Sequence, residues 1–373
     1  MKKTSSSSDT FGSYIRRLRI KNDIGQRELA KQIGVAPSYL NDMEKNKRTA
    51  PRTELIKKLS VKLKADLNLL YDLAGNSKKT VAPDIVDYIE NNPKIVSLLR
   101  TTKNSKLSND EIEELEKKIS KSKTKTLIVA AGIGSRLKDH TENLPKCMLD
   151  FGGKTLLERQ IQSYKDCGIN NITVVRGYKK NKINYKNLNY ADNTDYENND
   201  ILNSIFYGEE VINGNIIIAY SDILFESNVV KRLLESDHDI SVVVDIDWRS
   251  YYVGRKDHPL SEAENVIFNS NNEVVKIGKI ATEKEEVHGE FIGMIKLNNR
   301  GAEIFKQNFN RVKKLYWNKP FQRAEIFQKA YLTDMIQELV NIGIKVHCVI
   351  IERGWKEIDT VEDYQKALKE FNQ

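Results

Sequence analysis

An apolar run that ends in a glycine-rich turn dominates the middle of this chain. Residues 127–146 read LIVAAGIGSRLKDHTENLPK, an apolar stretch that is followed by Gly132, Gly134, Arg136 and Lys146. This pattern predicts a buried strand that ends in a turn too tight for large side chains. Backbone N–H groups in such a turn can point at an anion, while Arg136 and Lys146 add a planar guanidinium and a point charge. The segment therefore predicts a binding site for a triphosphate.

Strand-like apolar runs alternate with helical patterns from residue 124 onward. Strand candidates are 125–131, 171–176, 216–220, 240–245, 266–268, 274–277, 291–297 and 346–351, and helix candidates are 155–167, 226–235, 299–308 and 331–342. This alternation indicates an α/β fold with a doubly wound, mostly parallel sheet. Ligands of such sheets bind at the carboxyl ends of the strands, which is where the glycine-rich turn would lie.

The string A-A-G-x-G-x-R followed by P-K resembles the signature of the nucleotidyltransferases that activate sugar phosphates, phosphocholine and phosphonates. The resemblance implies a Rossmann-like nucleotidyltransferase domain over residues 124–373. It also implies that Arg136 and Lys146 are catalytic. The nucleotide-binding residues are then expected to be Ala131, Gly132, Gly134, Ser135 and Ser221.

Two acidic residues follow apolar strands of this domain. Asp222 comes directly after 216–220, and Asp359 follows 347–351. Nucleotidyl transfer needs Mg²⁺, a hard cation that usually takes one or two carboxylates and fills its other positions with phosphate oxygens and water. The resemblance implies that Asp222 and Asp359 are these metal ligands. An Asp in such a place can also cap a helix, and Thr360 could do the same for the final helix.

The identity of the acceptor molecule is inferred mainly from a family resemblance, and less from the chemistry of single residues. Residues 262–302 and 330–363 are similar to cytidylyltransferases for phosphocholine and for small phosphonates such as aminoethyl- or hydroxyethylphosphonate. This implies CTP as the donor and pyrophosphate as a product. Lys279 would hold the phosphate or phosphonate of the acceptor, and acidic side chains would hold a cationic head group. These are Glu290, Asp334 and Glu357. The base and the acceptor stay open, and a sugar-1-phosphate nucleotidyltransferase is the alternative.

Positive charge is concentrated in the first part of the chain. The net charge is +8, and residues 1–80 alone hold 18 lysines and arginines against 8 acidic residues. An anionic polymer would bind there. A helix that opens at Gln26 and stops at Gly34 is followed by another that begins at Pro37, which is the helix-turn-helix plan.

Residues 15–63 are similar to the Xre or Cro-repressor family over nearly their whole length. The resemblance implies a small all-α helix-turn-helix domain, residues 8–75, that binds duplex DNA. The residues expected to face DNA are Gln26, Ser38, Tyr39 and Asn41, and those expected to approach phosphates are Lys45, Lys47 and Arg48. The alternative is a domain that serves only in dimerisation or docking.

Residues 76–123 are expected to form a helical linker or arm between the two domains. Residues 75–79 (GNSKK) indicate a break, after which 83–100 and 108–121 show helical periodicity. Ser108 lies three residues before Glu111, as in a capping box. The segment is either an arm that forms dimers or a stiff linker, and we expect a homodimer.

Composition limits the cellular setting. The chain has 373 residues, of which 39% are hydrophobic and 30% charged, and no apolar run reaches the ~20 residues of a membrane span. Its start lacks the apolar core of a signal peptide, and the three cysteines show no C-x-x-C spacing. We therefore expect a cytoplasmic protein that does not insert into membranes.

These observations together predict a two-domain, Mg²⁺-dependent cytidylyltransferase. The rival from another class is a DNA-binding regulator whose transferase fold senses a nucleotide without turning it over. The presence of Arg136, Lys146, Asp222 and Asp359 argues against that rival, because a pure sensor does not need both metal carboxylates.

Overall fold

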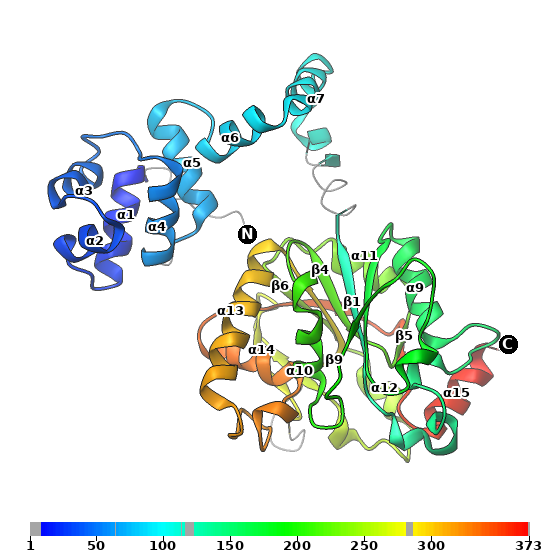
Figure 1. Ribbon diagram of the computed structural model, residues 1–373. Helices are drawn as coiled ribbons and strands as arrows, with labels where there is room; N and C mark the ends of the chain where they lie inside the picture. Colours follow the sequence, from blue (N-terminus) through cyan, green and yellow to red (C-terminus); the bar gives the residue numbers. More distant parts are fainter. Residues whose placement is uncertain (1–8, 64, 113, 116–122, 281–285, 372–373) are drawn as a thin grey trace. The chain divides into compact units, whose positions relative to one another are not determined.

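The chain divides into two compact units, residues 1–112 and 113–373. The computed structural model describes residues 9–371 apart from residues 64, 113, 116–122 and 281–285 (Figure 1). Within these residues, no helix has the length and apolar character that crossing a membrane requires.

Five helices pack around one apolar core in the first unit. They are α1 (Phe11–Lys21), α2 (Gln26–Ile33), α3 (Pro37–Glu44), α4 (Thr53–Leu63) and α5 (Leu67–Lys78). Each contributes a fully buried side chain to this core, including Ile15, Leu29, Leu40, Leu59 and Leu70. Apolar residues at helical spacing thus form one core in this unit.

The turn between α2 and α3 follows the expected chemistry. Gly34 ends α2 with a positive φ of 78°, a conformation that glycine adopts without the strain of a Cβ. Pro37 occupies the first turn of α3, where its missing N–H would have no helical partner. The helix-turn-helix prediction is confirmed at this level.

The break predicted at residues 75–79 is confirmed only at its end, because α5 continues through Gly75 and ends at Lys78, with Lys79 as its C-cap. A Cβ at Gly75 would lie 2.9 Å from both the Thr80 carbonyl oxygen and the Ala82 nitrogen. Gly75 is therefore suited to a close approach of the following chain and does not end the helix.

Two further helices follow, α6 (Pro83–Asn91) and α7 (Pro93–Asn104), and none of their residues is buried in the described part of the chain. Pro93 separates them, where the sequence predicted one segment over 83–100. The capping box at Ser108 is confirmed, because its backbone N–H donates to the Glu111 carboxylate at 2.8 Å and its Oγ accepts from the Glu111 N–H at 3.3 Å. Residues 116–121 of the other predicted helix lie outside the described residues.

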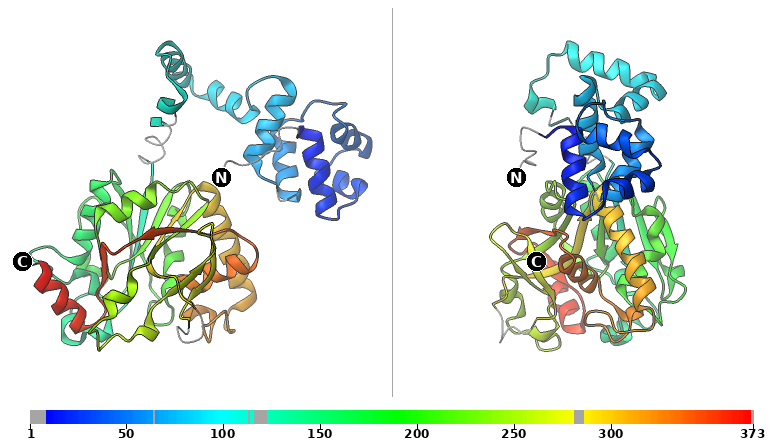
Figure 2. Two further views of the ribbon diagram at one scale, coloured as in Figure 1. Left: turned by 180° about the vertical axis from the view of Figure 1, so that it is seen from behind. Right: turned by 90° about the vertical axis from the view of Figure 1, so that its left-hand side faces the viewer.

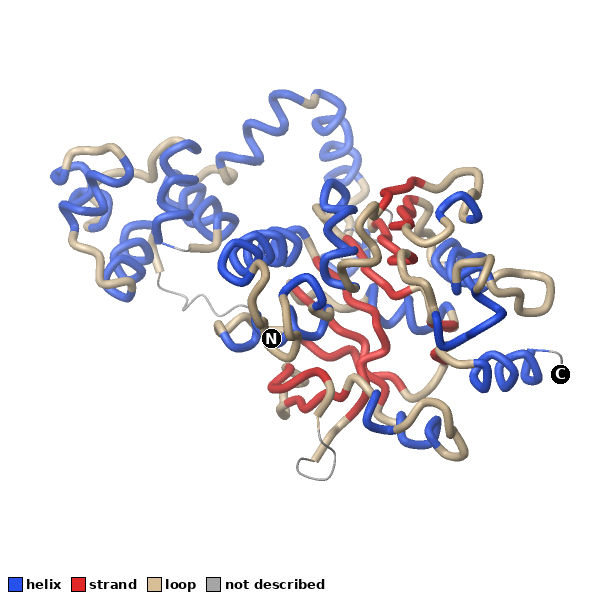
Figure 3. The backbone as a smooth tube through the Cα atoms, turned by 60° about the horizontal axis from the view of Figure 1, so that its bottom comes forward, coloured by secondary structure: helices blue, strands red, loops and turns tan. Residues whose placement is uncertain are grey.

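A mixed sheet forms the centre of the second unit (Figure 3). Its strands follow the order β10-β6-β9-β4-β1-β2-β3. The strands in that order are β10 (His347–Ile351), β6 (Ile240–Asp245), β9 (Gly289–Leu297), β4 (Ile216–Tyr220), β1 (Lys125–Ala130), β2 (Asn171–Arg176) and β3 (Asn189–Asp192). β9 runs antiparallel to β4 and β6, and the other neighbours in this order are parallel. A hairpin of β7 (Asn265–Phe268) and β8 (Val274–Gly278) joins β9.

Helices cover both faces of the sheet (Figures 1 and 2). Alternation along β1 explains this, because Leu127 and Val129 belong to one apolar core and Ile128 and Ala130 to the other. The first core includes residues of α10 (Ile201–Ile205), α13 (Asn299–Tyr316) and α14 (Leu332–Asn341), and the second includes residues of α9 (Leu156–Asp166) and α11 (Ser227–Leu234). The doubly wound, mostly parallel fold is therefore confirmed.

Short elements complete the unit. β5 (Ile223–Phe225) and β11 (Trp355–Glu357) form a separate antiparallel pair, called here the ribbon. The remaining helices are α12 (Trp248–Tyr252) and α15 (Val361–Phe371), and the 3₁₀ segments are η1 (Ser135–Thr141), η2 (Lys146–Met148), η3 (Lys180–Lys182), η4 (Phe206–Val211), η5 (Leu260–Glu262) and η6 (Phe327–Lys329).

Candidate active site

The carboxyl ends of β1 and β4 lie side by side, because Val129 pairs with Tyr220 in parallel register. The glycine-rich turn after β1 and Asp222 after β4 therefore leave the sheet at the same edge. A cavity of about 280 Å³, called here the edge cavity, lies between them. Its lining residues are Val129, Ala130, Gly132, Gly134, Ser135, Arg136, Pro145, Lys146, Cys147, Asp200, Ile201, Tyr220, Ser221, Asp222 and Asp359.

The two glycines of the turn have different surroundings. Gly134 has a positive φ of 70°, and a Cβ there would lie 3.0 Å from the Cβ of Lys146. Both conditions favour glycine at this position. A Cβ at Gly132 would meet no described atom within 4 Å, so its backbone borders open space in the cavity. The turn thus exposes main chain where the sequence predicted contact with phosphates.

Lys146 lies between two carboxylates. Pro145 is extended and leads into η2, which places the Lys146 side chain, only 8% exposed, in the edge cavity. Its Nζ donates to Asp222 Oδ2 at 2.9 Å and to Asp359 Oδ1 at 2.6 Å. Burial favours the neutral amine, but the charges of Asp222 and Asp359 outweigh it and raise the pKa of Lys146 above its usual range. Lys146 is therefore a fixed cation.

The ribbon explains why Asp222 and Asp359 meet. Asp222 immediately precedes β5, and Asp359 follows β11 by two residues. Glu357 pairs with Ile223, and the next backbone bond runs from the Ile358 N–H to the Asp222 carbonyl oxygen at 2.8 Å. Antiparallel pairing thus aligns the two segments that hold the carboxylates.

Capping of α15 leaves the Asp359 carboxylate available to the cavity. Thr360 Oγ1 accepts from the Asp363 N–H at 3.1 Å, and Asp363 Oδ2 accepts from the Thr360 N–H at 2.9 Å. Thr360 and Asp363 therefore cap this helix. The side chain of Thr360, and not that of Asp359, therefore caps the start of α15.

Three cationic or potentially cationic groups surround the Asp359 carboxylate. Besides Lys146, Arg136 Nη1 lies 2.5 Å and His258 Nδ1 lies 3.2 Å from Asp359 Oδ2. Burial alone would raise the pKa of Asp359, but the charge of Lys146, the close contact with His258 and the charge of Arg136 lower it well below its usual range. Asp359 is therefore ionised at neutral pH.

Glu357 lies behind Asp359 and completes an acidic layer. It accepts from Arg255 Nη2 at 3.1 Å and lies 3.6 Å from His258 Nε2. Burial and the charge of Asp359 raise the pKa of Glu357. Ligand atoms of His258, Glu357 and Asp359 lie within 4.8 Å of one another, a spacing that suits a metal ion.

The structure brings most of the predicted nucleotide and metal residues together. Gly132, Gly134, Ser135, Arg136, Lys146, Ser221, Asp222 and Asp359 all line the edge cavity. Ala131 is not among the lining residues. It is buried, and its carbonyl oxygen accepts from the Tyr178 N–H at 3.0 Å.

The four residues predicted for the acceptor lie outside the lining of the edge cavity. Lys279 forms an ion pair with Glu262, and Asp334 accepts from Arg323 Nε at 3.1 Å. Glu290 is buried and accepts from the Tyr252 hydroxyl at 2.6 Å, and Glu357 is held by Arg255. Their role in acceptor binding stays a prediction.

Sequence reasoning missed three polar residues of this region. Asp200 and Tyr220 line the edge cavity, and His258 contacts Asp359. Tyr220 is the last residue of a predicted strand, so its position at the sheet edge could have been inferred. Asp200 caps the five-residue α10, and His258 lies between two short helical segments. Neither has a local pattern that marks it.

The residues predicted to bind DNA lie on or next to α2 and α3. Ser38 is exposed and Tyr39 and Asn41 are partly exposed on α3, followed by exposed Lys45, Lys47 and Arg48. Gln26 donates from Nε2 to Glu44 Oε2 at 2.9 Å, so its amide has an internal partner. The Arg48 guanidinium stacks over the Tyr39 ring at 5.0 Å. One side of α3 is therefore an exposed or partly exposed polar surface, and cationic residues follow the end of the helix.

Comparisons with known proteins agree with this division. The family model of the MobA-like NTP transferase domain matches residues 126–272, and a helix-turn-helix model matches residues 15–70.

Several proteins with a named activity are similar to this chain. The CTP:phosphoglutamine cytidylyltransferase of Campylobacter jejuni is 28% identical over 256 residues, which cover 65% of this chain and 98% of that enzyme. The 2-aminoethylphosphonate cytidylyltransferase of Lancefieldella rimae is 26% identical over 163 residues, which cover 42% of this chain and 61% of that enzyme. The solved CTP:phosphocholine cytidylyltransferase of Streptococcus pneumoniae superimposes with a TM-score of 0.51 at 20% identity, covering 67% of this chain and 99% of that one.

Proposed function

We propose that this enzyme, a nucleotidyltransferase with a helix-turn-helix domain ahead of its transferase domain, transfers a cytidylyl group from CTP to a small phosphorylated or phosphonate acceptor. An acceptor oxygen would attack the α-phosphorus of CTP, and the bond to the β-phosphate would break, which releases pyrophosphate. The observation that carries the proposal is Lys146, held between Asp222 and Asp359 beside the glycine-rich turn. The cytidylyltransferase relatives support CTP as the donor.

The donor atoms of the site fit a hard divalent cation. Asp222 Oδ1 is buried and has no hydrogen-bond partner among the described residues, although it belongs to a residue that lines the edge cavity. A buried carboxylate oxygen without a partner is costly unless a ligand satisfies it. Asp222 and Asp359 would hold Mg²⁺, which when bound would neutralise charge on the phosphate oxygens.

The chain's own groups would position the triphosphate. The main chain at Gly132 borders open space, where its amide can face phosphate oxygens. Arg136 is half-exposed at the cavity, and Lys146 is buried within it. Both cations would stabilise the negative charge that grows on the departing pyrophosphate. Catalysis would then consist mainly of positioning and electrostatic stabilisation.

A screen for pyrophosphate release tests the proposal. CTP, UTP, ATP and GTP would each be offered with phosphocholine, 2-aminoethylphosphonate, hydroxyethylphosphonate, phosphoglutamine and glucose-1-phosphate. We expect turnover with CTP and one of the first four acceptors. Turnover only with glucose-1-phosphate would favour a sugar-1-phosphate nucleotidyltransferase and contradict the proposed acceptor class. Turnover with UTP and not CTP would contradict the proposed donor.

We further propose that the helix-turn-helix domain, residues 8–75, binds duplex DNA, and that residues 76–123 connect it to the transferase domain of residues 124–373. The exposed face of α3 and the cations that follow it support this proposal. Phosphate contacts from Lys45, Lys47 and Arg48 would position the domain, and Ser38, Tyr39 and Asn41 would read bases.

A further inference from the structure

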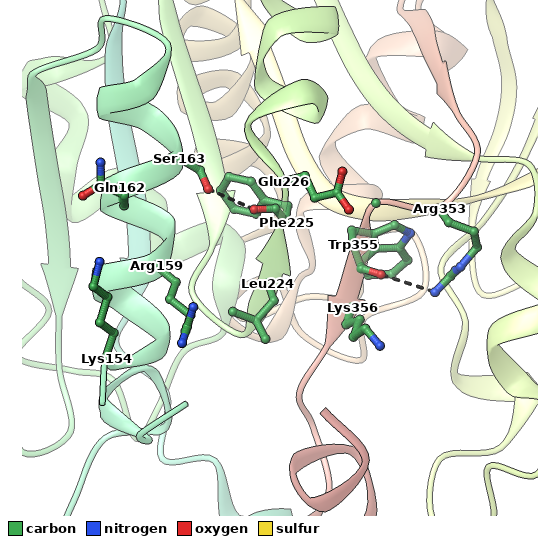
Figure 4. A pocket seen from close by; sticks show the side chains of 11 residues that line it. Lys154, Arg159, Gln162, Ser163, Leu224, Phe225, Glu226, Arg353, Trp355 and Lys356 are labelled. Carbon is green, nitrogen blue, oxygen red and sulfur yellow. Dashed lines mark hydrogen bonds between the residues drawn. The ribbon is translucent and has the colours of Figure 1, made fainter. Parts of the chain in front are cut away.

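A second cavity, of about 460 Å³, lies on the ribbon and shares no described lining residue with the edge cavity. Figure 4 shows α9 on one side of it, with Arg159, and β11 on the other, with Trp355 and Lys356. Leu224 and Phe225 of β5 lie between them. Its volume is within the range of small-molecule sites, roughly 300–1,000 Å³. We call it the ribbon cavity.

Most of the charged side chains at the ribbon cavity are cationic. Lys154, Arg159, Arg353 and Lys356 line it, against a single acidic residue, Glu226. Counted by formal charge, the lining is positive, with Arg353 ion-paired to the buried Asp245 at 2.7 Å and Arg159 donating from Nε to the Phe151 carbonyl oxygen at 2.9 Å. Burial and the positive charges of Arg353 and Lys366 lower the pKa of Lys356. An anion bound here would relieve this repulsion between like charges.

The same cavity has an apolar wall. Leu224, Phe225 and Trp355 line it, and each is between 5% and 8% exposed. Apolar side chains beside a few charged groups are typical of small-molecule sites, in which apolar surface gives affinity and the charges orient the ligand. A simple inorganic anion would use only part of these features.

We propose that the ribbon cavity is a second ligand site, which binds a small molecule that joins an anionic phosphate or carboxylate group to a flat apolar group. This proposal goes beyond the transfer reaction and does not depend on the identity of the acceptor. The anionic group would meet Lys154, Arg159 and Lys356, and the apolar group would lie against Trp355 and Phe225.

The position of this cavity suits an effector. β5 begins directly after Asp222, and β11 ends two residues before Asp359, so one ribbon connects the ribbon cavity to both carboxylates of the edge cavity. A ligand that binds one arrangement of the ribbon better than another must change nucleotide affinity at the edge cavity, and the nucleotide must change the ligand's affinity by the same factor.

Calorimetric titration of the full chain with phenyl phosphate tests the site, with benzoate as the carboxylate probe and inorganic phosphate and phenol as partial probes. We expect phenyl phosphate or benzoate to bind at least about tenfold more tightly than either partial probe. The double variant Lys154→Gln/Lys356→Gln should weaken this binding by about tenfold or more, since each removed cation takes away a charge-assisted contact. Gln162→Trp, which places a larger side chain at a residue that lines the cavity and retains its cations, should weaken it as well.

Two variants serve as controls. Lys314→Gln removes an exposed lysine from α13, and Arg136→Ala changes the edge cavity, so both should bind phenyl phosphate as the wild type does. Binding that survives both Lys154→Gln/Lys356→Gln and Gln162→Trp would overturn the proposal, as would no binding of either full probe at millimolar concentration. Binding lost only in Arg136→Ala would place the probe in the edge cavity and also overturn it.

A last titration, with and without CTP and Mg²⁺, tests the effector role. An affinity for phenyl phosphate that changes at least threefold, about 0.6 kcal/mol, would support coupling. An unchanged affinity, in a protein shown to bind CTP, would contradict the effector role while leaving the ligand site in place.

Discussion

Lys146 connects the parts of the candidate site, since its ammonium group contacts both Asp222 and Asp359. A cation that is buried between two carboxylates is held by their charges, and the carboxylates in turn depend on it. Changing any of the three residues will therefore affect stability as well as chemistry. Experiments on this site need a measurement of folding beside each measurement of rate.

Asp222→Asn and Asp359→Asn should each abolish turnover while the chain stays folded, because a neutral amide is a poor ligand for Mg²⁺ in competition with water. Pyrophosphate release at low millimolar Mg²⁺ measures the rate, and circular dichroism checks the fold. Asp237→Asn, an exposed residue after α11, is the matched control and should retain activity. A folded Asp222→Asn or Asp359→Asn variant with a wild-type kcat would exclude that residue as a required metal ligand.

Arg136→Ala and Lys146→Ala should each lower kcat/KM for CTP by about two orders of magnitude, roughly 3 kcal/mol, because each removes a charged donor to the transition state. Lys146→Ala should also lower stability, since it leaves Asp222 and Asp359 facing each other without their shared cation. Arg300→Ala, on the exposed part of α13, is the control for loss of a guanidinium. Losses under about threefold in both variants would mean that the glycine-rich turn is only structural.

Glu290 should make the protein less stable as pH rises. Burial and the charge of Glu357 raise the pKa of Glu290 from 4.5 to about 8, so the folded state keeps a proton that the unfolded chain has already released. Stability from this group is complete below about pH 4.5 and is lost as pH rises toward 8. Glu264, whose pKa burial raises to about 7, acts in the same direction.

Glu290→Gln should therefore lose less stability than the wild type between pH 5 and pH 8, by on the order of a few kcal/mol. The glutamine keeps an oxygen that can accept from the Tyr252 hydroxyl. Urea unfolding midpoints at the two pH values measure the difference. Equal pH dependence in the two proteins would mean that Glu290 titrates near its usual pKa.

Secondary structure was predictable wherever a segment has its own pattern. β4 (IIIAY) and the last four residues of β1 (LIVA) are apolar runs next to turn residues, and their sequence alone marks them as buried strands. The ribbon strands β5 and β11 have three residues each, ILF and WKE, and only their pairing with each other makes them strands. The meeting of Asp222 with Asp359 depends on that pairing. It followed from the family resemblance and not from a local signal.

Gly75 illustrates the opposite error, in which a local signal was present and misleading. A glycine near polar residues indicates a helix end. Here Gly75 lies inside α5, where its missing side chain permits close contact with the chain at residues 80–82. Gly75→Ala tests this explanation. Alanine favours a helix by about 1 kcal/mol over glycine, but its Cβ would lie 2.9 Å from two backbone atoms.

We expect the steric clash of the new Cβ to outweigh the higher helix propensity of alanine. Gly75→Ala should therefore lower the stability of the first unit by about 1–3 kcal/mol. Hydrogen exchange of the α5 amides in the full chain measures the free energy of opening of the first unit. Gly25→Ala is the matched control, because a Cβ there has its nearest contact at 3.8 Å. A more stable Gly75→Ala variant would show that the chain after α5 can move away.

At the scale of the molecule, charge is divided between the two units. The 18 basic against 8 acidic residues of positions 1–80 predict that the full chain binds duplex DNA with an affinity that falls steeply with salt, because each neutralised phosphate releases counterions. Substituting Tyr39 and Asn41 by alanine should remove sequence preference and retain the salt-dependent background. Fluorescence anisotropy at several salt concentrations measures both properties.

A chain that starts near residue 122 is the control for this prediction, because it lacks the first unit and retains β1. It should lose DNA binding and keep transferase activity. If the full chain shows no salt-sensitive DNA binding at about 50 mM salt, the helix-turn-helix domain serves in assembly and not in DNA recognition.

The ribbon also determines when, during folding, the site can exist. Lys146 contacts partners that lie 76 and 213 positions away along the chain, and the second separation is about twice the 106 positions between the paired residues His347 of β10 and Ser241 of β6. Contacts between distant segments form late, because the entropy of the intervening chain must be lost before they can form. Local opening of a three-residue strand such as β11 would separate Asp359 from Lys146 and leave the central sheet intact. The candidate active site is therefore expected to be the part of this fold that assembles last and is lost first.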